Sequence, residues 1–158
     1  MTVDTLFAIT FPMTVPFWAL MVFAPAWSIT HRIISSPWII LPPLAVYLVL
    51  AIPRLPALWE VVSRPDLDLI TAFFGQRDGA AILWAHVIAF DLFIARWMYL
   101  DSRERGIHPL LMGPLLVFTL LLSPMGLLIH MTIRTIVGAP RNAPAAALAE
   151  KHETRSGS

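Results

Sequence analysis

The chain has 158 residues, of which 58% are hydrophobic and 13% are charged, and its formal net charge is +1. The apolar residues form long continuous blocks, which argues against a soluble globular domain and indicates an all-α integral membrane protein in contact with membrane lipid. The weak charge, without a basic stripe, argues against a nucleic-acid partner, and the lack of cysteine excludes disulfides, thiolate nucleophiles and cysteine-ligated metal sites.

Four apolar segments are predicted to cross the membrane, because a hydrocarbon core of about 30 Å needs roughly 20 apolar helical residues. They run over about residues 6–29, 38–52, 80–99 and 110–132. The first has no basic segment before it and no small-residue cleavage site after it, so we interpret it as a retained helix and not a signal peptide. The predicted fold class is therefore an all-α, integral membrane four-helix bundle over residues 1–138.

The connection between the second and third predicted spans contains a short amphipathic segment after Pro65 that ends near Gly75. Its apolar stripe is formed by Leu67, Ile70, Phe73 and Phe74. Proline at the start, one apolar face and glycine at the end are typical of a short helix. We expect this helix to lie on the membrane surface, and a re-entrant segment that covers a cavity is the alternative.

Residues 139–158 are polar and contain prolines, which predicts a disordered cytoplasmic tail. The orientation follows from the Lys and Arg residues of the short loops. With four spans, both termini and the loop of residues 54–79 share the side that carries more of these residues. We therefore predict that both termini are cytoplasmic, and the economy of the chain favours a bacterial inner membrane.

The third predicted span and its end, residues 84–101, read WAHVIAFDLFIARWMYLD, and three ionisable side chains lie inside this apolar and aromatic segment, ahead of Asp101 at its end. These are His86, Asp91 and Arg96. An Asp or Arg at mid-depth costs roughly 2.5–3.5 kcal/mol on insertion scales, so such residues indicate a functional site by default. The structural alternative is that these side chains pair with polar groups of other spans and only hold the bundle together.

On an ideal helix, one face of this span is shared by His86, Phe90, Phe93 and Trp97. Asp91 and Arg96 point to two other sides, so one helix alone does not bring the three ionisable groups together. We expect each of them to meet a different neighbour, and a π-bulge that re-registers them is the alternative. Asp101, near the end of the helix, is predicted to be a solvated carboxylate in an interfacial aromatic belt.

The fourth predicted span adds Ser123, Gly126 and His130 around Pro124. Pro124 cannot donate a hydrogen bond to the carbonyl group four residues earlier, so a kink is expected there. Gly126 would let another backbone or a flat ligand approach closely. A metal site from His86, Asp91 and His130 is an alternative, since these ligands suit zinc or iron. No His-x-x-x-His or Glu-x-x-His spacing supports it, so neither a metal nor a cofactor is predicted.

The segment WAHVIAFDLFIARWMYLD, followed by LLMGPLLVFTLLLSPMGLLIHMTIR, resembles the neoxanthin-synthase-like membrane family, named for the plant abscisic-acid-deficient type-four protein. The matching positions are Trp84, His86, Asp91, Leu92, Phe93, Arg96, Trp97, Asp101, Pro124, Gly126, Leu127 and Leu128. APAWSITHRII, residues 24–34, fits as well, so the resemblance covers nearly all of residues 6–134. The family often has a glycine at the position of Ala95, and this chain departs from it there.

The resemblance implies a four-helix membrane protein of xanthophyll metabolism, a part of carotenoid biosynthesis. In plants the family is required to convert the epoxide violaxanthin into the allenic alcohol neoxanthin, which is a redox-neutral isomerisation. Opening the epoxide needs a proton donor and forming the allene needs a base. We expect His86 and Asp91 to be this acid/base pair, with Arg96 positioning Asp91 or stabilising an oxyanion. The predicted slot for a carotenoid or isoprenoid substrate is lined by Trp84, Phe90, Phe93, Trp97, Ser123, Gly126 and His130.

A second hypothesis is a non-catalytic scaffold that binds a pigment or a lipid for a partner enzyme. Under either hypothesis the protein could form a homo-oligomer. A small channel or transporter is disfavoured, because one helix alone carries the charges and no inverted repeat is visible in the sequence.

Overall fold

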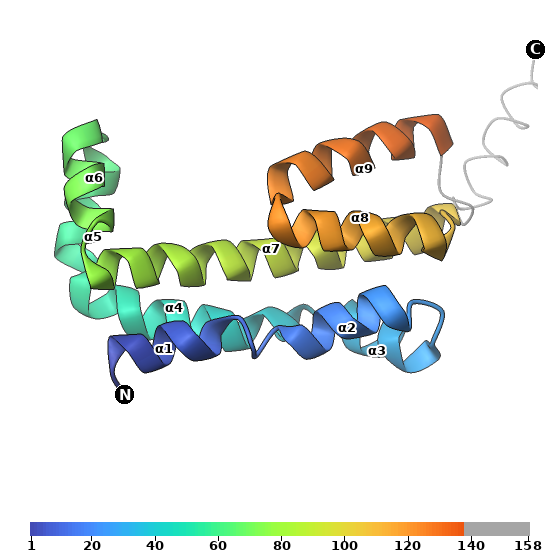
Figure 1. The fold of residues 1–158 in the computed structure, drawn as a ribbon, viewed down its shortest axis with the longest axis horizontal. Coiled ribbons are helices and arrows are strands. Elements are labelled where there is room, and N and C mark those ends of the chain that lie inside the picture. Colours follow the sequence, from blue (N-terminus) through green and yellow to red (C-terminus); the bar gives the residue numbers. More distant parts are fainter. Residues whose placement is uncertain (138–158) are drawn as a thin grey trace, which may run out of the picture.

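The computed structural model describes residues 1–137, and all of its regular elements in that range are helices (Figure 1). The first seven elements in chain order are α1 Val3–Thr10, α2 Val15–Phe23, α3 Ser28–Ser35, the 3₁₀ helix η1 Pro37–Ile40, α4 Leu41–Ala51, the 3₁₀ turn η2 Ile52–Arg54 and α5 Leu55–Ser63. They are followed by α6 Leu67–Phe74, α7 Arg77–Arg105, α8 Pro109–Leu121 and α9 Ser123–Val137. The predicted tail of residues 139–158 lies outside the described residues.

Three stretches of helix are long and apolar enough to cross a membrane. They are Val3–Phe23 with 21 residues, Pro37–Ser63 with 27 residues and Arg77–Arg105 with 29 residues. These stretches overlap the first three predicted spans, although the first ends at Phe23 and not near residue 29, where α3 has already begun. In contrast, α8 has 13 residues and α9 has 15, so at 1.5 Å per residue each is about 20 Å long and too short to cross the membrane alone.

The fourth predicted span is wrong as a continuous helix, because the chain reverses between α8 and α9 (Figure 1). Leu122 leaves the helical region, with φ −140° and ψ 66°. Ser123 precedes Pro124, and a residue before proline is disfavoured in the helical conformation. Gly126 then lets α9 lie close against α8, because a Cβ atom at this position would be 2.1 Å from Thr119 Oγ1. The described fold is therefore three rods of membrane-spanning length with a helical hairpin, and a four-helix bundle is not confirmed.

The hairpin changes the expected membrane topology. The end of α9 lies at the same end of the molecule as the end of α7, whereas the N-terminus lies at the opposite end (Figure 1). A hydrogen bond from His130 and an ion pair from Arg134, both on α9, reach Asp101 near the end of α7 and hold this arrangement. The prediction that both termini are cytoplasmic is not supported, because it depended on a fourth complete crossing.

The first rod is interrupted between α1 and α2, where Pro12 and Pro16 each lack a backbone N–H. Two threonines satisfy carbonyl groups around the break. The hydroxyl of Thr10 donates to the Leu6 carbonyl oxygen at 2.7 Å, and the hydroxyl of Thr14 donates to the Phe11 carbonyl oxygen at 2.8 Å. Both threonines are fully buried. Hydrocarbon offers no partner for polar backbone groups, so these internal bonds allow the break to lie within a spanning segment.

The predicted short amphipathic helix is confirmed as α6. It is capped by Asp66, whose Oδ1 accepts hydrogen bonds from the N–H groups of Asp68 at 3.0 Å and Leu69 at 3.1 Å. With α5 it turns away from the axis of α7 at one end of the molecule (Figure 1). Its position at the membrane surface stays a prediction.

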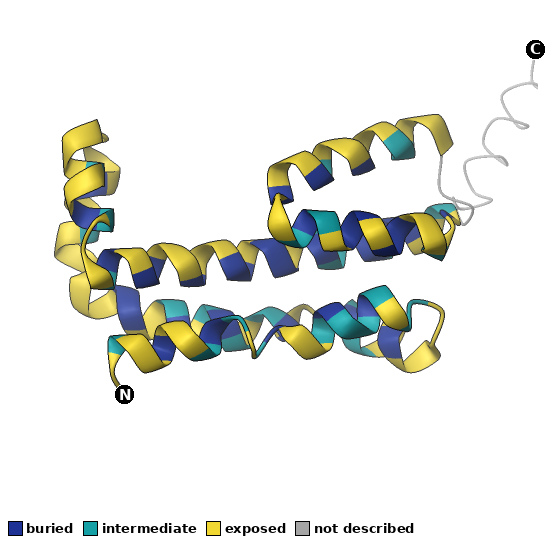
Figure 2. Ribbon diagram, in the orientation of Figure 1, coloured by how far each residue is buried: buried dark blue, intermediate teal, exposed yellow. Residues whose placement is uncertain are grey.

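The buried residues lie mainly along α7 and on the faces of the other helices that meet it (Figure 2). Many large apolar side chains on the outer faces are exposed, among them Phe23 at 85% and Leu121 at 75%. Such an outer surface fits lipid hydrocarbon, where apolar side chains need no protein cover. The helix α7 is therefore the centre of the fold, and its polar side chains are the ones placed to form an internal site.

Candidate functional site

The three ionisable side chains of α7 that were predicted to be catalytic point to three different sides, as the helical spacing predicts. His86 is exposed and stacks on Phe90, with ring centroids 4.6 Å apart. Arg96 donates a hydrogen bond from its guanidinium group to the carbonyl oxygen of Ser35 at 2.5 Å, at the end of α3. Asp91 is only 8% exposed. The helix α7 is continuous from Arg77 to Arg105 and contains no π-bulge, so His86 and Asp91 are not brought together.

Asp91 lines a cavity of about 330 Å³ at the middle of α7. The cavity lies where the break between α1 and α2 meets the end of α8. Its other lining residues are Phe11, Trp84, Val87, Ile88, Leu120 and Leu121. All of these are apolar or aromatic, so the carboxylate is the ionisable group of the cavity. Trp84, predicted to bind substrate, lies in this cavity.

Ser123 lies beside the Asp91 carboxylate because the reversal after α8 makes it the first residue of α9. Its hydroxyl oxygen is buried, and the Asp91 carboxylate is the hydrogen-bond acceptor beside it. The turn thus places a hydroxyl group next to the carboxylate that lines the cavity.

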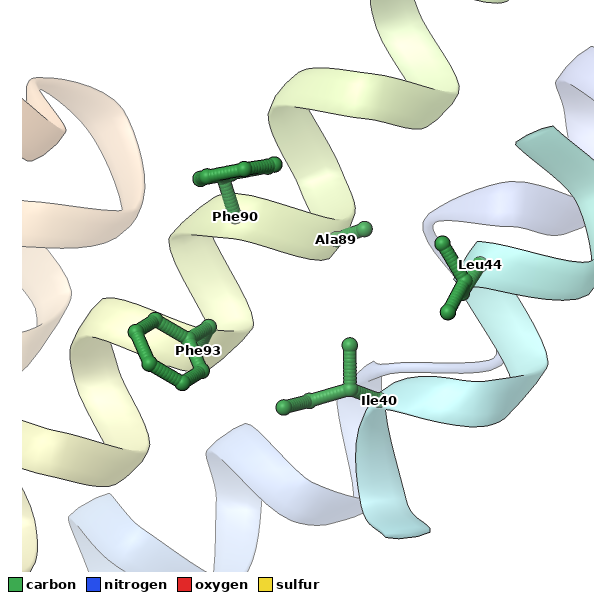
Figure 3. A pocket seen from close by; sticks show the side chains of 5 residues that line it. All are labelled: Ile40, Leu44, Ala89, Phe90 and Phe93. Carbon is green, nitrogen blue, oxygen red and sulfur yellow. The ribbon is translucent and has the colours of Figure 1, made fainter. Parts of the chain in front are cut away.

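A second hollow, of about 260 Å³, lies between α7 and the helices η1 and α4 (Figure 3). It is lined by Ile40, Leu44, Ala89, Phe90 and Phe93. No polar side chain lines it, so it can hold an apolar chain but offers no group for proton transfer. Phe90 and Phe93 were predicted to line the same slot as Ser123, but the structure places them in this separate hollow.

An ionic cluster joins α7 to α9. The carboxylate of Asp101 accepts hydrogen bonds from Arg105 Nε at 3.0 Å and from His130 Nε2 at 3.0 Å, and Arg134 approaches it to 3.2 Å. Trp97 packs against the same groups: its ring is 5.3 Å from the His130 ring and 5.1 Å from the Arg134 guanidinium carbon. The arrangement fixes the last turns of α7 against the second half of α9.

The cluster corrects the expectation that Asp101 is solvated, because this residue is only 8% exposed. The physical reason is the reversal at Ser123, which folds α9 back over the end of α7. His130 is fully buried, and its Nδ1 atom has no hydrogen-bond partner among residues 1–137. The sequence did carry a signal for this cluster, since Asp101–Arg105 and His130–Arg134 both have the i, i+4 spacing of helical neighbours.

Gly126 and the alternative metal site are the two remaining predictions that the structure bears on. Gly126 contacts Thr119 of α8 and allows the close packing of the hairpin. No group of three or more His, Cys, Asp and Glu side chains in residues 1–137 could hold a metal ion. His86, Asp91 and His130 each meet different neighbours, so the alternative metal site is not formed by these residues.

Comparisons with known proteins find a matching family model and a similar plant protein. A family model described as ABA DEFICIENT 4-like matches residues 5–130, which include Asp91, Asp101, Ser123 and His130. The chain is 32% identical over 140 residues to "Protein ABA DEFICIENT 4, chloroplastic" of Arabidopsis thaliana. The match covers 85% of this chain and 62% of that protein, so the chain spans less than two thirds of this relative's length. No solved structure matches the chain.

Proposed function

Since the chain belongs to the ABA DEFICIENT 4-like family, we propose that it is a membrane protein that acts on a carotenoid or a related isoprenoid by redox-neutral acid/base isomerisation. The resemblance to neoxanthin-synthase-like proteins supplies the substrate class. The observation that carries the chemistry is the Asp91 carboxylate in an apolar cavity at the middle of α7. An ionisable group at this depth is expensive to bury, and a function accounts for its presence.

Asp91 can supply both proton transfers of an epoxide isomerisation. As a carboxylic acid it donates its proton to the epoxide oxygen while a carbon–oxygen bond breaks. The resulting carboxylate then accepts a proton from a neighbouring carbon, and the new carbon–carbon double bond forms. The proton count is unchanged, and Asp91 returns to its starting state. The Ser123 hydroxyl lies beside the carboxylate, so it can donate a hydrogen bond to the epoxide oxygen as well.

The geometry favours Ser123 over His86 as the partner of Asp91. His86 is exposed on another side of α7 and stacks on Phe90. Arg96 is bound to the Ser35 carbonyl oxygen, and we assign it the positioning of α3 against α7. Trp84 would contact the substrate in the Asp91 cavity, whereas Phe90 and Phe93 would contact an apolar chain in the separate hollow.

A second candidate function is a non-catalytic membrane scaffold that binds a pigment or a lipid for a partner enzyme. The apolar hollow of Figure 3 favours it, because the five side chains that line it offer binding surface and no reactive group. In that case the protein would keep its ligand through purification and convert nothing. A homo-oligomer and a partner enzyme both stay proposals, as does a location in a bacterial inner membrane.

The test is co-expression with a pathway that produces epoxycarotenoids, followed by pigment analysis. Wild-type protein is expected to convert an epoxide into an isomer of the same mass, and Ser123→Ala is expected to slow the conversion. Bound pigment with an unchanged profile would support the scaffold. An unchanged profile without bound pigment, from correctly folded wild-type protein, would contradict both functions.

A further inference from the structure

Two hollows, one at Asp91 on α7 and one between α2 and α8, share part of their lining. The first is the Asp91 cavity of about 330 Å³, and the second, of about 250 Å³, lies between α2 and α8. Phe11 and Leu120 line both of them, so the hollows share a boundary. The second hollow follows α2 from Val15 to Phe23, and its lining side chains are all apolar or aromatic. We call these two hollows together the α2–α8 groove.

The α2–α8 groove is elongated. It follows the nine residues of α2, which span about 13 Å, and reaches past the break at Phe11 to the Asp91 cavity. Asp91 is the central residue of α7, so this end of the groove lies near mid-depth in the membrane. Phe23 ends the first rod, so the other end lies near one membrane face. The groove therefore runs along the membrane normal, from the polar centre of the fold to its edge.

The groove offers polar groups at one end only. Asp91 lines the inner end, and the buried Ser123 hydroxyl lies beside its carboxylate. A ligand hydroxyl could donate to the carboxylate and accept from Ser123 at once. A hydrocarbon or a lipid acyl chain could form neither hydrogen bond, so it would not match this polar end of the groove.

We infer that the α2–α8 groove binds a long isoprenoid by one hydroxylated end, with the hydroxyl group between Asp91 and Ser123 and the apolar chain along α2 and α8 toward Phe23. This inference rests on the proposed function, because it assigns the ligand class of the same site. It adds that the protein recognises one oxygenated end at mid-depth and not a whole molecule that spans the bilayer.

The test measures binding of all-trans-retinol, a twenty-carbon isoprenoid alcohol, to the protein in phosphatidylcholine nanodiscs. Trp18 and Trp84 line the groove, so bound retinol is expected to quench tryptophan fluorescence by energy transfer. Retinyl acetate has the same chain but no hydroxyl donor, and serves as the matched ligand. We expect saturable quenching by retinol, and at least tenfold weaker binding of retinyl acetate.

Four variants test where the ligand binds. Asp91→Leu is expected to weaken retinol binding at least tenfold and to remove the preference over retinyl acetate. Ala19→Phe fills the apolar part of the groove, so it is expected to weaken both ligands equally. Ala8→Phe makes the same change at an exposed position of α1 and is the control, with unchanged binding. Ser123→Ala offers a milder test, with a reduced preference for the alcohol, should Asp91→Leu fail to fold.

Equal binding of the two ligands to wild-type protein would overturn the inference and show an unselective surface for lipid chains. Weaker binding to the Ala8→Phe protein, or unchanged binding to the Ala19→Phe protein, would contradict the assignment of the ligand to the α2–α8 groove. Retinol carries no epoxide, so the result is independent of turnover. A protein that binds retinol as expected but leaves epoxycarotenoids unchanged would keep this inference and contradict the proposed isomerisation.

Discussion

The carboxylate of Asp101 accepts a hydrogen bond from His130 Nε2 at 3.0 Å, and this contact joins the end of α7 to the middle of α9. Arg105 and Arg134 surround the same carboxylate, which is 8% exposed. One buried anion therefore fixes the fold of the hairpin. Because Ser123 lies on that hairpin, the contact also determines which group faces Asp91 in the candidate site.

Removal of the anion is expected to destabilise the protein. Asp101→Asn would leave three basic side chains without their carboxylate, and the loss of one partner from a buried ionic cluster costs roughly 3–5 kcal/mol. Unfolding in detergent, followed by circular dichroism, measures the effect. The control is Asp78→Asn, which removes an exposed ion pair with Arg54 and should cost about 0–1 kcal/mol. Equal stability of the two variants would contradict the role of Asp101.

The hairpin also depends on the close packing of α9 on α8. Gly126→Ala would place a Cβ atom 2.1 Å from Thr119 Oγ1 and 2.8 Å from its Cα atom, so the helices must separate. We expect a clear drop in melting temperature. Gly113→Ala is the matched control, because its Cβ atom would meet only the Val22 carbonyl oxygen at 3.6 Å, an ordinary contact. A Gly126→Ala protein as stable as Gly113→Ala would argue against the packing.

Three rods and a hairpin predict that the N-terminus and the end of α9 lie on opposite sides of the membrane. The chain has no cysteine, so single cysteines at Thr2 and Val137 can be labelled without background. An impermeant maleimide, added to sealed vesicles, should reach one of the two positions from outside and the other only after permeabilisation. Labelling of both positions from the same side would support four complete spans instead.

His86 is expected to be dispensable for turnover. Its ring stacks on Phe90 outside the Asp91 cavity, so His86→Phe keeps an aromatic contact and removes only the titratable group. The rate of isomerisation should stay within about twofold of the wild-type rate, and the pH dependence should be unchanged. A large loss of rate with an intact fold would restore the acid/base pair predicted from the sequence.

Much of the fold follows from the sequence, because long apolar runs and helix caps are local signals. The three rods overlap the predicted apolar blocks, and α6 ends before Gly75 as its pattern indicates, although it begins at Leu67 and not at Pro65. Helical geometry also predicts correctly that His86, Asp91 and Arg96 meet different neighbours.

The hairpin could not be predicted in this way. Pro124 indicates an interrupted helix, but a kink and a complete reversal leave the same local pattern. The choice depends on contacts between residues far apart in the chain, chiefly His130 and Arg134 with Asp101. The solvated Asp101 was a wrong prediction for the same reason, since its cover comes from α9. The roles of the site residues in catalysis stay predictions.

The most direct test of the account is the rate of epoxycarotenoid isomerisation by purified protein in proteoliposomes, with wild-type protein compared with Asp91→Asn. The substitution keeps the shape of the side chain and removes its ability to transfer a proton, so the account predicts a rate at least about 100-fold lower with little change in melting temperature. A variant that isomerises the substrate at the wild-type rate would contradict the central claim that Asp91 performs the chemistry.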